Sequence, residues 1–181
     1  MKFIGIKQIW YGAPFASTDL DSGSLTGAKV KAWLSAQTTT EVKNSHEGTW
    51  GYSQDDPSTE DYINELTGKP YHRDMTSEGN KTITWTMGAY DFTDKAALQG
   101  GTGDQNHWES GDIDLVYKGV VAKTKTGNYI VFTNASITAK TDQQNKALGL
   151  GVTAVAMESE VEGLKDEYLF KGSVVDTVAG T

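Results

Sequence analysis

The last third of this chain is a series of short runs whose apolar residues recur at every second position, and this pattern constrains the fold most. Antiparallel strands that follow one another along the chain give such period-two runs, and short polar turns join them. The sequence therefore predicts a mainly β, antiparallel fold. The expected strands are Asp112–Thr124, Tyr129–Lys140, Ala147–Met157 and Glu167–Val175, with turns at Thr126–Asn128 and Thr141–Lys146.

The run Tyr129–Lys140 carries the most detailed pattern. Its odd positions, from Tyr129 to Ala139, form one mostly apolar face. Its even positions change from Ile130 and Phe132 to polar residues. We therefore expect one end of this strand to be buried on both faces and the other end on one face only.

Length and charge limit the classes of protein that fit. A chain of 181 residues predicts a single domain over residues 1–181, with a long loop or arm at about 54–77. The absence of Cys excludes disulfides and thiolate metal sites. A net charge of −8 disfavours direct binding to nucleic acid, which needs a basic patch. This acidity fits either ordinary solubility or a surface that must pass a polyanion without gripping it.

Three further strands are predicted within the first 53 residues of the chain. Phe3–Trp10 is the first strand, and Ala28–Leu34 alternates like a half-buried strand. Thr38–Ser53 is β-prone but polar, which favours a long exposed or edge strand. No run approaches the roughly 20 apolar residues that span a bilayer, and MKFIGIKQIW lacks the features of a signal peptide.

The clearest local patterns lie in the middle of the chain. In Lys81–Met87 the residues Ile83, Trp85 and Met87 are expected to face inward and the threonines outward. Tyr90–Gly101 is the best helix, with Thr93 as the expected N-cap and Gly100-Gly101 at the end.

The segment Gln54–Ser77 leaves two alternatives open. Ser58–Thr67 can form a short helix that stops at Gly68, or the whole segment can be an extended arm. A segment of this length without its own core must pack back over the body or reach a neighbour.

Nothing in the sequence indicates catalysis, a cofactor or a metal. His46, His72 and His107 are isolated and lack a partner at metal-ligand spacing. Asp19-x-Asp21-x-Gly23 opens like a calcium loop but lacks its glycine position and its distant glutamate. We therefore expect no enzyme. A glycoside hydrolase is the remaining enzymatic alternative, supported only by the number of carboxylates.

A set of aromatic residues favours a different kind of function. Trp50, Tyr52 and Trp108 could stack on sugars. The alternative function is therefore a carbohydrate-binding or adhesive β-sandwich module.

Two longer stretches, Thr82–Gly103 and Phe132–Glu158, have an order of elements that resembles the major tail tube protein of long-tailed bacteriophages. One is a clean strand followed by an acidic-capped helix that ends in Gly-Gly, and the other is a strand with Asn-Ala, a polar link and Leu-Gly-Leu-x-Val-Thr-Ala. The resemblance runs from Val42 to Phe170 and includes the interrupted segment before the clean strand. The two stretches are Thr82–Gly103 (TITWTMGAYDFTDKAALQGGTG) and Phe132–Glu158 (FTNASITAKTDQQNKALGLGVTAVAME).

This resemblance implies a β-sandwich or barrel of two packed antiparallel sheets with one short flanking helix. It implies that six copies close into a ring, that rings stack into a tube, and that DNA passes through without specific binding. The partners would be the chain itself and other phage tail proteins, in the virion tail, after synthesis in the bacterial host cytoplasm. A tail terminator or a related tail component is the structural alternative.

Residues for the two surfaces of such a tube follow from their exposure and charge. Asp112 and Asp114, beside the candidate inner sheet, are expected to face the lumen, where carboxylates repel phosphates. Glu158, Glu160 and Glu162, in the turn after another strand, are the alternative. Aromatic and apolar residues on the edge strand and the arm are expected at the subunit interface. They are Trp50, Tyr52, Tyr62, Leu66 and Tyr71.

Overall fold

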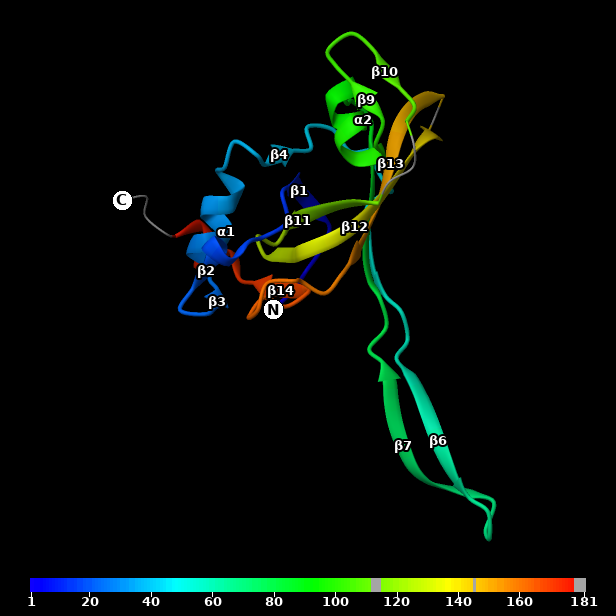
Figure 1. Cartoon of the computed structure of the whole chain (residues 1–181). Helices are drawn as coiled ribbons and strands as arrows, with labels where there is room; N and C mark the ends of the chain where they lie inside the picture. Colours follow the sequence, from blue (N-terminus) through cyan, green and yellow to red (C-terminus); the bar gives the residue numbers. More distant parts are fainter. Residues whose placement is uncertain (112–114, 145, 178–181) are drawn as a thin grey trace.

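The computed structural model describes residues 1–111, 115–144 and 146–177, and its main feature is one large, rolled antiparallel sheet (Figure 1). The strand order is β4-β1-β11-β12-β13-β8-β5, and β14 pairs with β12 beside this path. The strands are β1 (Ile6–Gly12), β4 (Thr40–Glu41), β5 (Gly51–Gln54), β8 (Lys81–Met87), β11 (Val116–Thr124), β12 (Tyr129–Gln144), β13 (Ala147–Ala156) and β14 (Glu167–Phe170).

Short hairpins and helices complete the described part of the chain. The two-stranded sheets are β2 (Leu20–Asp21) with β3 (Ser24–Leu25), β6 (Ser58–Asn64) with β7 (Lys69–Ser77), and β9 (Thr102–Gly103) with β10 (Trp108–Glu109). The helices are η1 (Ser17–Asp19), α1 (Gly27–Leu34), α2 (Phe92–Gln99) and α3 (Gly172–Asp176). The predicted class is confirmed, since the fold is mainly antiparallel β and consistent with a sandwich or barrel. In addition to the expected flanking helix α2, the described residues form α1 and α3.

The segment between β4 and β5 joins the two sides of the sheet. At its start, Val42 donates its backbone N–H to the carbonyl of Ile9 in β1, over 2.9 Å. Further along, His46 donates to the carbonyl of Thr86 in β8, also over 2.9 Å. The chain therefore crosses from β1 to β8, and the sheet curls around a closed interior.

That interior is the first of two hydrophobic clusters. Trp85 and Phe132 are its largest fully buried side chains, and strands β1, β8, β11, β12 and β13 all contribute. Leu98 of α2 is also fully buried there. The Tyr11 hydroxyl donates to Asp94 of α2 over 2.5 Å. Burial, and then this bond to Asp94, raises the pKa of Tyr11 far above its usual value, so this phenol stays neutral and holds α2 against the body.

The second cluster lies on the opposite face of β1, β11 and β12. Trp10, Val121 and Val131 of these strands are buried there against Val30 and Trp33 of α1. Figure 1 shows α1, β2 and β3 gathered on this side of the sheet. The body thus has two apolar layers, one inside the roll and one beneath the helical cover.

The strand β12 changes face along its length, which corrects the single apolar face expected for its odd positions. Tyr129 and Val131 lie in the second cluster, whereas Ala135 and Ile137 lie in the first. The pairing of β11 with β12 shifts by one residue between Lys118 and Val120. A bulge of this kind inverts the alternation of all later side chains. The prediction that one end is buried on both faces is confirmed by Ile130 and Phe132.

The prediction of a strand at Ala28–Leu34 is wrong, because these residues form α1. The hydroxyl of Thr26 accepts the N–H of Lys29 over 3.4 Å, as an N-cap does. Val30 and Trp33, three positions apart, are buried, whereas Ala32 is exposed. A strand has a side-chain period of two and a helix a period of about 3.6. In a segment this short, the apolar positions fit both periods.

Several predicted boundaries also change. Thr38–Ser53 is not one long strand, since only β4 and the start of β5 are extended in it. The expected turn Thr141–Lys146 is mostly strand, because β12 pairs with β13 up to Gln144. The expected strand Glu167–Val175 stops at Phe170, and Gly172 begins α3.

The middle of the chain is closest to its prediction. The bounds of β8 and the inward positions of Ile83, Trp85 and Met87 are confirmed, although Thr86 is also buried. Helix α2 is confirmed but begins later, and its N-cap is Asp91 and not Thr93. An Asp91 carboxylate oxygen accepts the N–H of Asp94 over 2.8 Å, and a carboxylate at an N-cap also favours the helix dipole.

Candidate assembly surface

Residues 54–77 form a hairpin arm that projects from the body, which is the extended form of the two alternatives for this segment (Figure 1). Strands β6 and β7 pair from Ser58 with Ser77 to Asn64 with Lys69. At the turn, Gly68 has a φ of 65° and donates its N–H to the carbonyl of Asn64 over 2.8 Å. Glycine is favoured at such a left-handed position. The helix Ser58–Thr67 does not form.

Every residue of β6 and β7 except Asn64 is exposed. Leu66 in the turn is 95% exposed and Tyr71 70%. Ile63 and Met75 are at least half exposed as well. An isolated two-stranded hairpin is at best marginally stable in water. These exposed apolar side chains form no core that would stabilise the arm.

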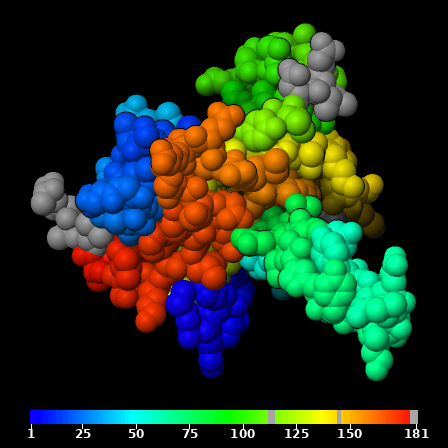
Figure 2. All heavy atoms as spheres, turned by 60° about the horizontal axis from the view of Figure 1, so that its bottom comes forward, coloured from blue at the N-terminus to red at the C-terminus, as the bar shows by residue number. Residues whose placement is uncertain are grey.

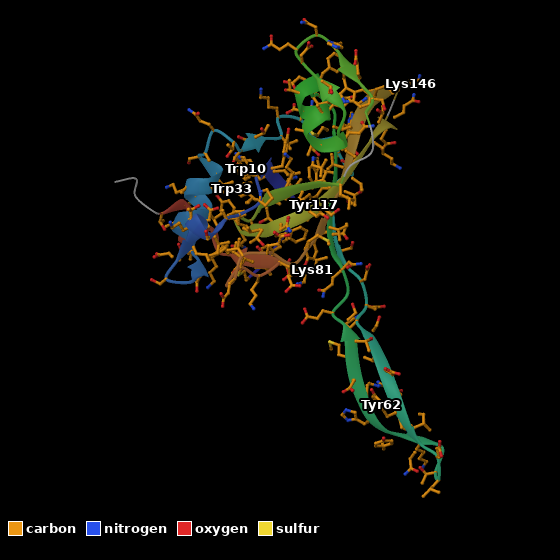
Figure 3. All side chains as sticks on the ribbon, in the orientation of Figure 1. Trp10, Trp33, Tyr62, Lys81, Tyr117 and Lys146 are labelled. Carbon is orange, nitrogen blue, oxygen red and sulfur yellow. The ribbon has the colours of Figure 1, made fainter. Side chains whose placement is uncertain are left out.

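Side chains on the two strands of the arm contact each other, and Figure 3 shows Tyr62 among the side chains that the arm carries. The rings of Tyr62 and His72 lie 5.7 Å apart. Arg73 donates to both carboxylate oxygens of Asp61, and its hydrogen bond lowers the pKa of that carboxyl. Residues 54–77 hold six acidic and two basic side chains, so the arm is a strongly acidic part of the molecule.

The base of the arm is fixed to the body. Pairing of β5 with β8 continues into it, since Asp55 donates its N–H to the carbonyl of Asn80 over 2.9 Å. Lys81 lies 2.7 Å from Asp166, and the hydrogen bond between them raises the pKa of Lys81. The arm therefore leaves the body in a defined direction, and its strands β6 and β7 are exposed except at Asn64.

A groove lies near the base of the arm, between the edge strands β5 and β14. Tyr52 of β5 donates its hydroxyl to Glu167 of β14 over 2.8 Å, which links the two edges. Burial and then Glu167 raise the pKa of Tyr52 above its usual value. The groove has a volume of about 500 Å³ and is mostly apolar. It is lined by Phe3, Gly5, Trp50, Gly51, Tyr52, Thr124, Ile130 and Leu169.

The residues predicted at the subunit interface fall in two places. Trp50 and Tyr52 line the groove together. Tyr62, Leu66 and Tyr71 lie on the arm. Asp112 and Asp114, predicted to face the lumen, lie outside the described residues. Sequence reasoning missed Phe3 and Leu169 as groove residues, because only the fold brings the N-terminal segment beside β14.

The aromatic residues behind the alternative, sugar-binding hypothesis lie in two places: Trp50 and Tyr52 line the groove, and Trp108 lies elsewhere. Trp108 packs at α2, where its Nε1–H donates to the carbonyl of Gly100 over 2.9 Å. The ammonium of Lys95 lies 4.0 Å from the centre of the Trp108 ring, a cation–π contact that covers one face of this indole.

Three of the candidate chemical groups noted in the sequence, Asp19, His72 and His107, have structural partners. Asp19 accepts the N–H of Ala16 over 2.8 Å, as a helix-capping residue does. His72 lies 2.8 Å from Asp74, and His107 lies 3.1 Å from Asp104. Among residues 1–111, 115–144 and 146–177, no group of three His, Asp or Glu is placed to hold a metal ion.

Comparison of the chain with known protein families and with curated proteins gives no match. In the described part of the chain, no helix has the length and apolar character needed to cross a bilayer. The features of the described residues that bear on function are the arm, the groove and the sheet edges.

Proposed function

We propose that this chain is a structural subunit of a phage tail tube, in which hexameric rings stack and conduct DNA during ejection. The observation that carries the proposal is the exposed arm of β6 and β7, with Leu66 95% exposed at its turn. An arm of this kind gains nothing for a lone molecule, because it buries no apolar surface on its own body. Contact with a neighbouring copy would cover it.

The open edges of the sheet support the same proposal. Strands β5 and β14 each have a hydrogen-bonded partner on one side only in the described sheet. An edge strand on a monomer leaves a row of backbone N–H and C=O groups unpaired, and a neighbouring copy can pair with these groups or cover them. A contact between two different surfaces of the same chain forms a ring when its rotation closes, and a filament when it repeats along an axis.

The charge of the chain fits a passage for DNA. A net charge of −8 opposes a tight grip on phosphates, so DNA would slide and not bind specifically. At physiological salt, charges act over about 8 Å, so only side chains that face the passage contribute. The placement of Asp112 and Asp114 on that surface stays a prediction, as do the contacts with other tail proteins and a place in the virion tail.

Negative-stain electron microscopy of the concentrated full-length chain tests this proposal. We expect rings or tubes whose abundance rises with protein concentration. A variant in which residues 56–79 are replaced by a short Gly-Ser linker is expected to keep the folded body and to lose the tubes. A full-length chain that stays monomeric across a wide range of concentration and salt, with its arm still protruding, would contradict the proposal.

A further inference from the structure

The apolar groove between β5 and β14 is an unfilled surface at the edge of the body. Its walls include Leu169, 51% exposed, Tyr52, 41% exposed, and Phe3, 36% exposed. Ile130 is buried and forms part of its lining. The hydrogen bond between Tyr52 and Glu167 links the two edge strands beside the groove. An apolar groove of this kind suits a segment that inserts a few apolar side chains.

The side of this groove formed by the N-terminal segment is basic, in contrast to the chain as a whole. Residues 1–9 and 123–128 hold four lysines and no acidic residue, and of these lysines Lys123 is paired with Asp176 over 2.9 Å. The two stretches lie together, because Lys125 donates its N–H to the carbonyl of Ile4 over 3.1 Å. The Lys125 side chain also lies against Gly5, which lines the groove. A partner with an acidic character is therefore favoured here.

The end of the arm has the complementary properties. It presents Ile63, Leu66 and Tyr71, which are all at least half exposed. Glu65 is adjacent to Leu66, and the arm as a whole has six acidic and two basic side chains. This segment of the same chain thus combines exposed apolar side chains with an excess of negative charge.

The arm cannot fill the groove of its own molecule. Its turn lies at the far end of a hairpin that extends away from the body (Figure 1). In Figure 2 the N-terminal residues and the arm are separate projections from the body. The occupant of the groove would therefore be the arm of another copy.

We propose that the turn of the arm, with Leu66 at its centre, docks in the groove between β5 and β14 of a second copy, beside Lys2 and Lys125. This inference rests on the proposed function and names the acceptor surface for the arm. Each copy carries one insert and one acceptor, which are different surfaces, so the contact repeats from copy to copy.

Disulfide trapping tests the contact directly, because the chain contains no native Cys. The full-length double variant Leu66→Cys/Leu169→Cys is assembled under reducing conditions and then oxidised with oxidised glutathione. Since a disulfide needs Cβ atoms roughly 3.8 Å apart, we expect a ladder of linked chains on a non-reducing gel. The matched control Leu66→Cys/Leu148→Cys uses a residue on β13 that is 66% exposed, and it is expected to stay unlinked.

A charge exchange gives a second readout. Lys125→Glu is expected to raise the protein concentration needed for assembly about fivefold, which corresponds to a rim charge pair of about 1 kcal/mol. Adding Glu65→Lys to this variant is expected to restore most of the loss.

The outcomes separate this inference from the function on which it rests. Tubes that form without the Leu66–Leu169 link, or with equal linking in the Leu148 control, overturn the acceptor groove and leave the tube subunit standing. A wild-type chain that does not assemble overturns both.

Discussion

The body and the arm of this molecule differ in how far their apolar side chains are buried. In the body, Trp85, Phe132 and Val131 are no more than 1% exposed, and both faces of the central strands are covered. In the arm, Leu66 and Tyr71 are at least 70% exposed, and the two strands pair with each other. The same residue types therefore stabilise the fold in one region and remain available for contact in the other.

The difference teaches where sequence change is costly. Burial of large side chains dominates stability, so the body should tolerate few changes in volume. The arm should tolerate many changes without loss of folding, although the same changes should impair assembly. Substitutions in each region and removal of the arm test this contrast.

Truncation of one aromatic residue in each region gives the largest contrast. Phe132→Ala removes a fully buried ring and is expected to lower the free energy of unfolding by about 3–5 kcal/mol. Tyr71→Ala in the arm is expected to change it by less than about 0.5 kcal/mol. Urea unfolding followed by tryptophan fluorescence measures both. Comparable losses in the two variants would show that the arm contributes to the core.

A smaller loss of unfolding free energy is expected at Gly27, where α1 packs closely against α3. A Cβ at Gly27 would lie 2.7 Å from Cγ1 of Val174 and closer still to the Val174 carbonyl oxygen. Gly27→Ala is therefore expected to push α1 and α3 apart and to cost about 1–3 kcal/mol. In the arm, Gly68 has no atom within 4 Å of a built Cβ, although its φ is 65°. Gly68→Ala serves as the control. It is expected to strain the turn of the arm and to leave the Tm of the body unchanged.

The bond between Tyr11 and Asp94 tests how α2 is held. Tyr11→Phe removes a hydroxyl that donates to a carboxylate over 2.5 Å and is expected to cost about 1.5–3 kcal/mol, as for other bonds to charged groups. Thermal unfolding measures the shift in Tm. No shift would mean that α2 is held by Leu98 and its other apolar contacts alone.

The N-cap of α2 provides a pH test. The hydroxyl of Thr93, and then the N–H of Asp94, hold the pKa of the Asp91 carboxyl below its usual range. This contribution to stability is therefore complete above about pH 4, the unfolded value, and is lost as the pH falls through the lowered folded value. Asp91→Asn keeps a capping side chain but does not titrate. Urea unfolding measures the free energy of unfolding from pH 6 to pH 2.5. This free energy should fall less in Asp91→Asn than in the wild type, by less than about 1 kcal/mol.

Replacement of residues 56–79 by a short linker should have the smallest effect on the body. None of these residues belongs to either hydrophobic cluster. The Tm of the body is therefore expected to change by less than about 2 °C, since a 1 kcal/mol change shifts it by only a few degrees. Circular dichroism with heating measures this. A body that unfolds without its arm would break the contrast between the two regions.

The parts of the fold that sequence predicted well are those in which local pattern and packing agree. In β8, the alternation of Ile83, Trp85 and Met87 with threonines matches the interior of the roll. In α1, the local alternation pointed to a strand, but Thr26 as N-cap and the cover over Trp10 favour a helix. Eight residues do not distinguish the two periods without knowledge of what they pack against.

The candidate site divides in a similar way. Exposed apolar residues on the arm, such as Tyr62 and Leu66, were visible as isolated apolar residues in a polar segment. The groove was not visible, because it joins residues as distant as Phe3, Trp50 and Leu169. The bulge in β12 was equally hidden, since one extra residue opposite Lys118–Val120 leaves no mark in composition.

The way in which the arm joins the body has a mechanical consequence. Strand β8 runs directly into the arm and is hydrogen-bonded on both sides, to β13 and to β5. Because the two ends of the arm continue into β5 and β8, a pull on the arm along its length draws these two strands together and loads the ladder between β8 and β13 in shear. Because the bonds of an antiparallel ladder run across the strands, many of them must yield at once, and not one after another as in unzipping. A molecule joined to its neighbours through this strand would resist tension along the arm far better than a sideways peel.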